Sequence, residues 1–285
     1  MKKLYYLISG FIIGIANVIP GLSGATLAVS LGIYEKIIES VTTLFSEFKK
    51  NIMFLSILGI GMIVGILTFA KGLSFAFEDY ELWTICFFIG LILGGVPYIF
   101  NKTNKSFDFK NILTFAIAFF LILFLGSMTV SGNGDITNPG IVDYMIILIA
   151  GFLGAAAMII PGISGSFIFI LLGVYEYIIN TLNNLTNPNL FLESFVVLFF
   201  LGIGVLIGIF TIAKVMKFLI EKHQNTTYTA ILGIIFASII VLIIPQIQTE
   251  VVFGQALIAV LLIDFGFFVS LLLGGIKWLV LYYSA

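Results

Sequence analysis

The sequence predicts an all-α integral membrane protein that is an inverted-topology tandem repeat, each half of which contains a re-entrant helical hairpin and three transmembrane helices. Three observations predict this fold class. Hydrophobic residues make up 61% of the 285 residues and charged residues only 9%, whereas an ordinary soluble domain is about one-quarter charged. One motif-bearing segment occurs twice, and nearly all lysines fall on one predicted side of the membrane.

The composition also narrows the class of function. The net charge is −1 and all thirteen basic residues are lysines, so the chain lacks the basic surface of a DNA- or RNA-binding protein and no nucleic-acid partner is expected. At about 20 residues per span, the length holds roughly seven to ten membrane segments. We therefore expect one multi-pass transmembrane domain over residues 1–285, with no cofactor and no metal site. The oligomeric state is left open by the sequence.

The repeat is visible without any alignment to other proteins. Segments of 29 residues that start at Gly10 and Gly151 share 14 identical positions at an offset of 141, including P-G-x-S-G and G-x-Y-E in the same order. A second match, at an offset of 143, joins 14-residue segments that start at Leu58 and Leu201. Apolar composition alone does not align two such motifs in order, so the chain is read as repeat one, 1–131, and repeat two, 143–285.

Each repeat follows the same plan of elements. An apolar limb runs up to Pro20 or Pro161, and a short limb then ends near Tyr34 or Tyr175. A polar, partly amphipathic stretch follows each short limb, at residues 36–50 and 177–193. Three plain hydrophobic spans then complete each half, and they are expected at residues 52–70, 82–100 and 111–130, and again at 195–213, 228–245 and 255–276.

Lysine positions indicate the topology, because short cytoplasmic loops collect lysine. If each P-G-x-S-G break is the tip of a hairpin, twelve of the thirteen lysines lie on the side of the N-terminus, and only Lys71 lies opposite. If each break is a kink within one span, no bias results. Both termini are therefore expected to be cytoplasmic. Three further crossings per half is an odd number, so the halves insert in opposite orientations, an architecture typical of secondary transporters.

Lysines do not separate a re-entrant hairpin from two full crossings. Residues 22–34 reach only about 20 Å as a helix, short of a hydrocarbon core of about 30 Å. Length therefore favours re-entrance, and full crossing stays open if the helix continues through residues 35–45. We expect one hairpin to enter from the cytoplasm and the other from outside, with their tips meeting near the midplane of the membrane.

The tips suggest an anion site. Proline interrupts the first limb, glycine allows unusual backbone angles, and Ser23 or Thr26 can cap the helix that follows. That helix begins inside the membrane with unpaired N–H groups, which favour an anion. The predicted substrate-binding residues are Asn17, Pro20, Gly21, Ser23, Gly24, Thr26, Pro161, Gly162, Ser164, Gly165 and Ser166. The alternative is that both breaks are packed kinks that bind nothing.

Other polar residues are candidates for coupling or gating: Glu35, Glu176, Asp264, Tyr34 and Tyr175. Glu35 and Glu176 occupy equivalent positions, and each is otherwise an interfacial anchor or the partner of a nearby lysine. Asp264 is the carboxylate deep inside a plain span, where its insertion costs about 3 kcal/mol, which favours a functional role. The G-x-x-x-G pairs Gly61/Gly65 and Gly204/Gly208 indicate close helix packing.

These motifs also resemble the signature of a known family. N-V-I-P-G-L-S-G-A-T at 17–26 with G-I-Y-E at 32–35, and P-G-I-S-G-S at 161–166 with G-V-Y-E at 173–176, are similar to those of the PopT-type polyprenyl-phosphate (undecaprenyl-phosphate) translocases, formerly a domain of unknown function. The resemblance covers essentially the whole chain. One departure is Ala25, where members often carry a second glycine.

The resemblance implies a flippase in a bacterial or archaeal plasma membrane that recycles undecaprenyl phosphate, the carrier lipid of the cell envelope, from the outer to the inner leaflet. Inward movement of an anion is uphill by about 2.3 kcal/mol per charge per 100 mV, so coupling to protons or sodium is expected. The residues themselves predict only a transporter with paired anion-binding tips. A secondary transporter of a small soluble anion is therefore the alternative, whereas an enzyme is not expected because the chain has no Arg and one His.

Overall fold

The computed structural model describes residues 2–18, 23–103, 108–127, 140–185, 187–247 and 253–282, and side chains within these ranges except at 18, 69–79, 81, 167, 171, 245–247, 253 and 273–282. Every regular element in the described ranges is a helix. Among the described residues, seven helical segments are long and apolar enough to cross a membrane: Phe48–Thr68, Leu82–Lys102, Phe109–Ser127, Ile141–Ile159, Phe191–Lys222, Gln224–Ile244 and Gly254–Leu272. The prediction of an all-α, multi-pass membrane protein is confirmed.

The two halves contain the same series of helices. The first half comprises α1 (Lys2–Val18), α2 (Gly24–Ser30), α3 (Tyr34–Thr42), α4 (Phe48–Lys102) and α5 (Phe109–Ser127). The second comprises α6 (Ile141–Ile159), α7 (Gly165–Leu171), α8 (Tyr175–Asn184), α9 (Phe191–Lys222), α10 (Gln224–Ile247) and α11 (Phe253–Tyr282). α4 holds two of the candidate spans, which a non-helical residue, Tyr80, separates. The short second limbs are thus seven-residue helices, and the polar stretches form α3 and α8.

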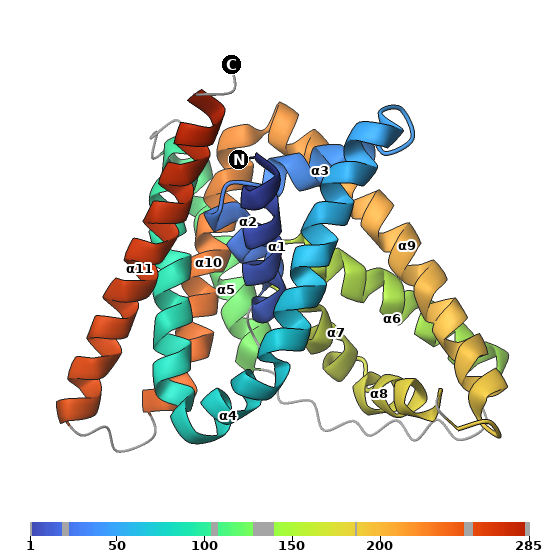
Figure 1. Cartoon of the computed structure of the whole chain (residues 1–285). Coiled ribbons are helices and arrows are strands. Elements are labelled where there is room, and N and C mark those ends of the chain that lie inside the picture. The colour runs from blue at the N-terminus through green and yellow to red at the C-terminus, as the bar shows by residue number, and fades with distance from the viewer. Residues whose placement is uncertain are drawn as a thin grey trace.

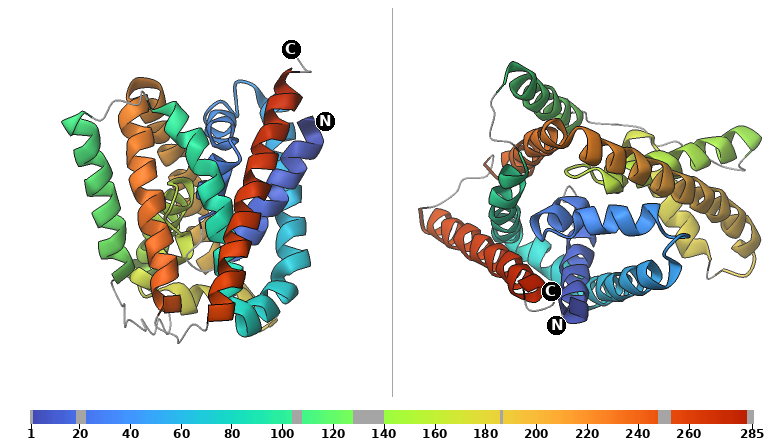
Figure 2. Two further views of the ribbon diagram at one scale, coloured as in Figure 1. Left: turned by 90° about the vertical axis from the view of Figure 1, so that its left-hand side faces the viewer. Right: turned by 90° about the horizontal axis from the view of Figure 1, so that it is seen from above.

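The helices are arranged around these short elements. Figure 1 shows both chain termini and α3 at one end of the helix bundle and α8 at the opposite end, and α2 lies within the bundle. The left view of Figure 2 again shows both termini at one end of the bundle, and its right view looks onto that end. Seven residues of helix rise only about 10 Å, one third of a hydrocarbon core. The sequence predicted α6 only as one limb of a hairpin, but its 19 residues are enough for a membrane span of their own.

Glycines hold the long helices of each half close together, as the G-x-x-x-G pairs predicted. A Cβ atom added to Gly61 would lie 2.2 Å from the Leu7 carbonyl oxygen of α1. In the second half, a Cβ added to Gly204 would lie 2.0 Å from the Leu148 carbonyl oxygen of α6. Because no side chain fits at these distances, α1 packs on α4 and α6 on α9 backbone to backbone, in equivalent ways.

Replacing Gly204 by Ala is expected to destabilise the protein by about 1–3 kcal/mol, because the added methyl group forces α6 and α9 apart. The midpoint of thermal unfolding in detergent measures this effect. Gly202→Ala is the matched control, since it adds the same methyl group to the same helix where no atom lies within 4 Å. Equal unfolding midpoints for the two variants would contradict the packing role.

The hydrophobic core is unequal in the two halves. Every residue of α2 is buried, and Leu27 and Val29 of this helix belong to a large cluster that also includes Tyr228 and Ile231 of α10. In the equivalent part of the second half, Ile170 and Leu172 are exposed. The first short helix is therefore enclosed by both halves, whereas the second is partly open.

Candidate functional site

The second break, between α6 and α7, has a backbone that only glycine suits. Ile160 is extended, as the residue before a proline should be, and Gly162 has a positive φ of 86°. The Ser238 hydroxyl of α10 lies 3.0 Å from the Gly162 carbonyl oxygen and donates to it. A Cβ at Gly162 would lie 2.0 Å from Cγ2 of Ile234. α10 therefore holds the break in place and leaves no room for a side chain.

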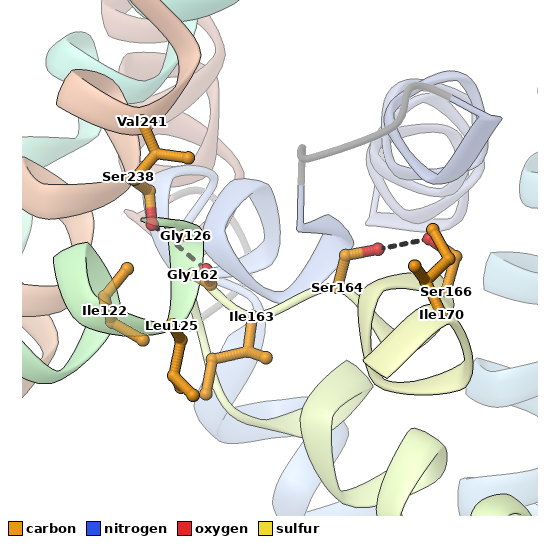
Figure 3. A pocket seen from close by; sticks show the side chains of 10 residues that line it. All are labelled: Ile122, Leu125, Gly126, Gly162, Ile163, Ser164, Ser166, Ile170, Ser238 and Val241. Atoms are coloured by element: carbon orange, nitrogen blue, oxygen red, sulfur yellow. Dashed lines mark hydrogen bonds between the residues drawn. The ribbon is translucent and has the colours of Figure 1, made fainter. Parts of the chain in front are cut away.

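Three hydroxyl groups line a cavity of about 250 Å³ beside this break (Figure 3). They belong to Ser164, Ser166 and Ser238, and Gly162 lines the same cavity. The Ser164 and Ser166 hydroxyl oxygens are 2.8 Å apart and share one hydrogen bond. Gly165 lies against α6, because a Cβ there would be 2.7 Å from Cγ of Met158. The remaining lining is apolar: Ile122, Leu125, Gly126, Ile163, Ile170 and Val241.

The first break is described from Ser23 onward, and Pro20 and Gly21 lie outside the described residues. The Ser23 carbonyl oxygen accepts from the Thr26 amide at 3.0 Å, which starts α2. The Ser23 and Thr26 hydroxyls are buried and have no hydrogen-bond partner among the described residues. The expected side-chain cap is therefore wrong for α2, and Ser164 likewise makes no cap bond to α7. The Ser164 hydroxyl shares a hydrogen bond with the Ser166 hydroxyl instead.

A second cavity of about 250 Å³ joins the first break to the other half of the chain. Asn17 and Gly24 line it from the first half, and Met158 and Ile159 line it from the last turn of α6. Asn17 and Gly24 are in close contact, because a Cβ at Gly24 would lie 2.4 Å from Oδ1 of Asn17. The end of α6 that precedes the second break therefore packs against the start of the first short helix.

Tyr34 stabilises this contact between the two halves with a hydrogen bond. Its hydroxyl donates to the Ile159 carbonyl oxygen at 2.9 Å, one of the last carbonyls of α6 and so without a partner in its own helix. Burial raises the pKa of Tyr34 above its usual value, which keeps the hydroxyl a donor. Tyr175, the repeat equivalent, is 37% exposed against 4% for Tyr34. The two tyrosines therefore have different surroundings despite identical G-x-Y-E motifs.

Glu35 lies in a small charged cluster at the end of the bundle that holds the termini. Its Oε1 is 2.8 Å from Nζ of Lys102, and the Tyr228 hydroxyl of α10 donates to the same oxygen. The Lys102 ammonium also lies 5.6 Å from the centre of the Tyr98 ring. The interpretation of Glu35 as a lysine partner is confirmed, whereas Glu176 is exposed.

Asp264 is not brought to either break. It is exposed on α11, and the span Gly254–Leu272 is the least covered of the seven. Neither cavity described above includes it. Sequence reasoning missed Ser238 and Lys102, although one signal for Ser238 was present: it is a single hydroxyl in the apolar run of residues 231–244.

Comparison with known proteins identifies similar sequences. A family model described as undecaprenyl phosphate translocase-like matches residues 13–259. A protein of Staphylococcus aureus named polyprenyl-phosphate transporter is 31% identical, over 96% of this chain and 97% of its own length. A Vibrio cholerae protein of the same name is 27% identical over 84% of this chain and 77% of its own. No solved structure matches the chain.

Proposed function

Since the chain belongs to the undecaprenyl phosphate translocase-like family, we propose that it moves a polyprenyl phosphate, such as undecaprenyl phosphate, between the leaflets of a bacterial plasma membrane. The observation that carries this function is the family match along 13–259, together with bacterial relatives named polyprenyl-phosphate transporters. The site supports it physically. Two cavities with polar groups in their lining, one with three serine hydroxyls and one with Asn17 and Tyr34, lie at breaks in helices of an apolar bundle, where a polar group without a partner is costly.

The phosphate group binds at the second break and passes to the first. Ser164 and Ser166 present two hydroxyl donors, and the first N–H groups of α7 have no acceptor within their own helix. Charge-assisted hydrogen bonds to an anion are about twice as strong as neutral ones. At the first break, the unpartnered hydroxyls of Ser23 and Thr26 offer the same chemistry. A phosphate monoester is therefore bound without any arginine.

The prenyl chain stays in the hydrocarbon region while only the phosphate follows a polar route. The cavity at the first break supports this division, because its polar groups, Asn17 and Tyr34, are surrounded by apolar side chains of several helices. A long isoprenoid gains nothing from leaving the bilayer. The halves are inverted repeats with cytoplasmic termini, which is supported by the opposite positions of α3 and α8 (Figure 1) and by the lysine bias. The hairpins are re-entrant, which is supported by the seven-residue lengths of α2 and α7, too short to cross the hydrocarbon core.

The lipid moves from the outer to the inner leaflet, and an ion gradient drives it. Inward transfer of the anion is opposed by about 2.3 kcal/mol per charge per 100 mV, which accompanying protons or sodium ions offset. Glu35 is the carboxylate best placed for coupling, because its cluster joins α3, the end of α4 and α10. Glu176 and Asp264 are exposed and lie outside the two cavities.

Glu35→Gln is expected to flatten the pH dependence of gradient-driven lipid transport, because the amide neither titrates nor pairs with Lys102 as an ion. Glu176→Gln is the matched control at the equivalent repeat position, and we expect it and Asp264→Asn to keep the wild-type profile. The transport rate in proteoliposomes between pH 6 and 8 measures the effect. A wild-type profile in all three variants would remove carboxylate-linked proton coupling.

The serine-lined cavity also suits a small soluble anion, which is the alternative function. Competition separates the two: a polyprenyl phosphate should displace a bound fluorescent polyprenyl phosphate, and a large excess of inorganic phosphate should displace it only weakly. Equal competition by inorganic phosphate, with its uptake into liposomes, would favour the small-anion transporter.

A further inference from the structure

The cavity at the second break has a polar side and an apolar side. Ser164 and Ser166 of the break supply the polar side, and Ile122 and Leu125 of α5 supply part of the apolar side. Figure 3 shows these two pairs well apart, with Ile163 between them. The cavity is therefore amphipathic, as is a lipid that carries a phosphate group.

The apolar side distinguishes between the two candidate ligands. A small hydrated anion that enters the cavity loses water, and side chains such as Ile122 and Leu125 offer it no hydrogen bond in return. A prenyl chain meets the same apolar surroundings in the cavity as in the bilayer, because lipid tails are as apolar as leucine. The apolar side therefore suits a chain that accompanies the phosphate.

The exposed lining residues mark where the cavity opens. Gly126 of α5 and Ile170 of α7 line the cavity and are exposed. Ile122 and Ser238 line it too, but each is only 7% exposed, so they lie deeper. α5 packs against α10, and few of the residues of α5 are buried. The opening between Gly126 and Ile170 therefore faces the lipid beside α5.

The opening lies far from the end of the bundle that holds the termini. Both α5 and α10 begin at that end, because Phe109 follows Lys102 closely in the chain and the Gln224 side chain donates to the Lys102 carbonyl oxygen at 3.2 Å. Gly126 and Val241, which both line the cavity, lie about 26 Å along their helices at 1.5 Å per residue. The hydrocarbon core is about 30 Å thick, so with cytoplasmic termini the opening belongs to the outer leaflet.

The two short helices differ in their access to lipid. Every residue of α2 is buried, whereas α7 has Ile170 at the opening, 43% exposed. In the proposed topology, α7 belongs to the hairpin that enters from outside. The open cavity and the outer leaflet are thus on the same side of the membrane.

We propose that polyprenyl phosphate enters the protein from the outer leaflet through the opening between Gly126 and Ile170, here called the lipid port. The phosphate lies at the break, the first isoprene unit lies on the apolar side that α5 forms, and the rest of the chain extends through the lipid port into the bilayer. Pockets for drug-sized ligands measure about 300–1,000 Å³, so about 250 Å³ holds a phosphate and a short piece of chain. This inference rests on the proposed function and adds the route of the lipid to it.

Gly126 sets the width of the lipid port. A Cβ atom added there would lie 2.7 Å from Cγ2 of Val241, which lines the same cavity. A larger side chain at position 126 therefore has to displace Val241 or project into the opening. We expect a bulky residue here to obstruct the chain while it leaves the serine hydroxyls in place.

The first test narrows the lipid port. Gly126→Leu is expected to slow the leaflet exchange of undecaprenyl phosphate in proteoliposomes by about 10-fold or more, because the added side chain overfills the opening. The matched control is Ser127→Leu, which adds bulk at the next residue of α5, exposed and outside the cavity. The control is expected to keep close to the wild-type rate, and both proteins should elute as single species from size exclusion. A wild-type rate for Gly126→Leu would overturn the lipid port.

The second test uses the wild-type protein, so it does not depend on the folding of a variant. A polyprenyl phosphate with a photoreactive diazirine on its first isoprene unit is expected to label Leu125 and Ile163. Excess undecaprenyl phosphate should suppress this labelling, and excess phosphatidylglycerol should not. The isomer with the diazirine on its last unit should label lipid-facing residues broadly. The same labelled positions for both isomers would overturn the lipid port.

Failure of the lipid port and failure of the proposed function give different results. If the wild type exchanges the lipid but the two isomers label alike, the function stands and the lipid port is wrong. If the first isomer labels the cavity but liposomes with protein exchange the lipid no faster than protein-free liposomes, the lipid port stands as a binding site and translocation is wrong.

Discussion

Ser164→Ala/Ser166→Ala is expected to slow the leaflet exchange of undecaprenyl phosphate by about 100-fold or more. Both hydroxyls line the cavity at the second break, where we place the phosphate group. A hydrogen bond to a charged group contributes about 1.5–3 kcal/mol, and each 1.4 kcal/mol is a factor of about ten. Exchange of a labelled lipid in proteoliposomes, measured by accessibility to a membrane-impermeant quencher, gives the rate.

The control for a folding defect is a variant that loses two hydroxyl groups elsewhere in the chain. Ser40→Ala/Ser194→Ala removes two buried hydroxyls that line neither cavity, and it is expected to exchange lipid at close to the wild-type rate. Both proteins should elute as single species from size exclusion. If the Ser164/Ser166 variant keeps the wild-type rate, the phosphate does not bind at the second break.

Gly162→Ala is expected to lose both stability and transport. A residue with φ of 86° is strained by about 1–3 kcal/mol when it carries a side chain, and overpacking adds about 1–3 kcal/mol because Ile234 occupies the space. The unfolding midpoint and the exchange rate should both fall. The matched control, Gly254→Ala, adds a methyl group where nothing lies within 4 Å.

A second-site change separates the two costs in Gly162→Ala. Ile234→Ala removes the Cγ2 atom that the new Cβ would meet at 2.0 Å, so the double variant should lose less stability than the sum of the two single variants. The stability that the double variant loses relative to Ile234→Ala alone measures the backbone strain. Strict additivity would show that α10 does not confine the break.

Local rules account for what the sequence predicted about the fold. Proline and glycine act on their own backbone and on the residue before them, so the positions of the breaks followed from the motifs, and α7 begins directly after the second. The G-x-x-x-G pairs likewise predict close helix packing, because glycine has no side chain. Long apolar runs give spans by length alone. These features need no knowledge of distant contacts.

The site depended on contacts that no local rule contains. Ser238 reaches Gly162 across 76 positions of the chain, and Tyr228 reaches Glu35 across 193. Equally, the identical G-x-Y-E motifs gave no warning that Tyr34 is buried and Tyr175 exposed. The difference arises because the end of α6 packs against the first short helix. Such asymmetry is a property of the packed halves and not of either repeat.

Asp264 shows that the free-energy cost of placing a charge inside a span is not enough to predict a functional role. A carboxylate in the middle of a span is expensive, which made a transport role the natural hypothesis. In the structure it is exposed on α11 and lines neither of the two cavities. Its place in the middle of a candidate span, Gly254–Leu272, was correctly inferred from the sequence, whereas the direction of the side chain depends on which helices cover α11.

The most direct measurement is leaflet exchange by the wild-type protein itself. Purified protein in liposomes that contain labelled undecaprenyl phosphate should equilibrate the lipid between leaflets far faster than protein-free liposomes do, and inorganic phosphate outside should scarcely slow it. An exchange rate equal to that of protein-free liposomes, accompanied by protein-dependent uptake of inorganic phosphate, would contradict lipid translocation and assign the two cavities to a soluble anion.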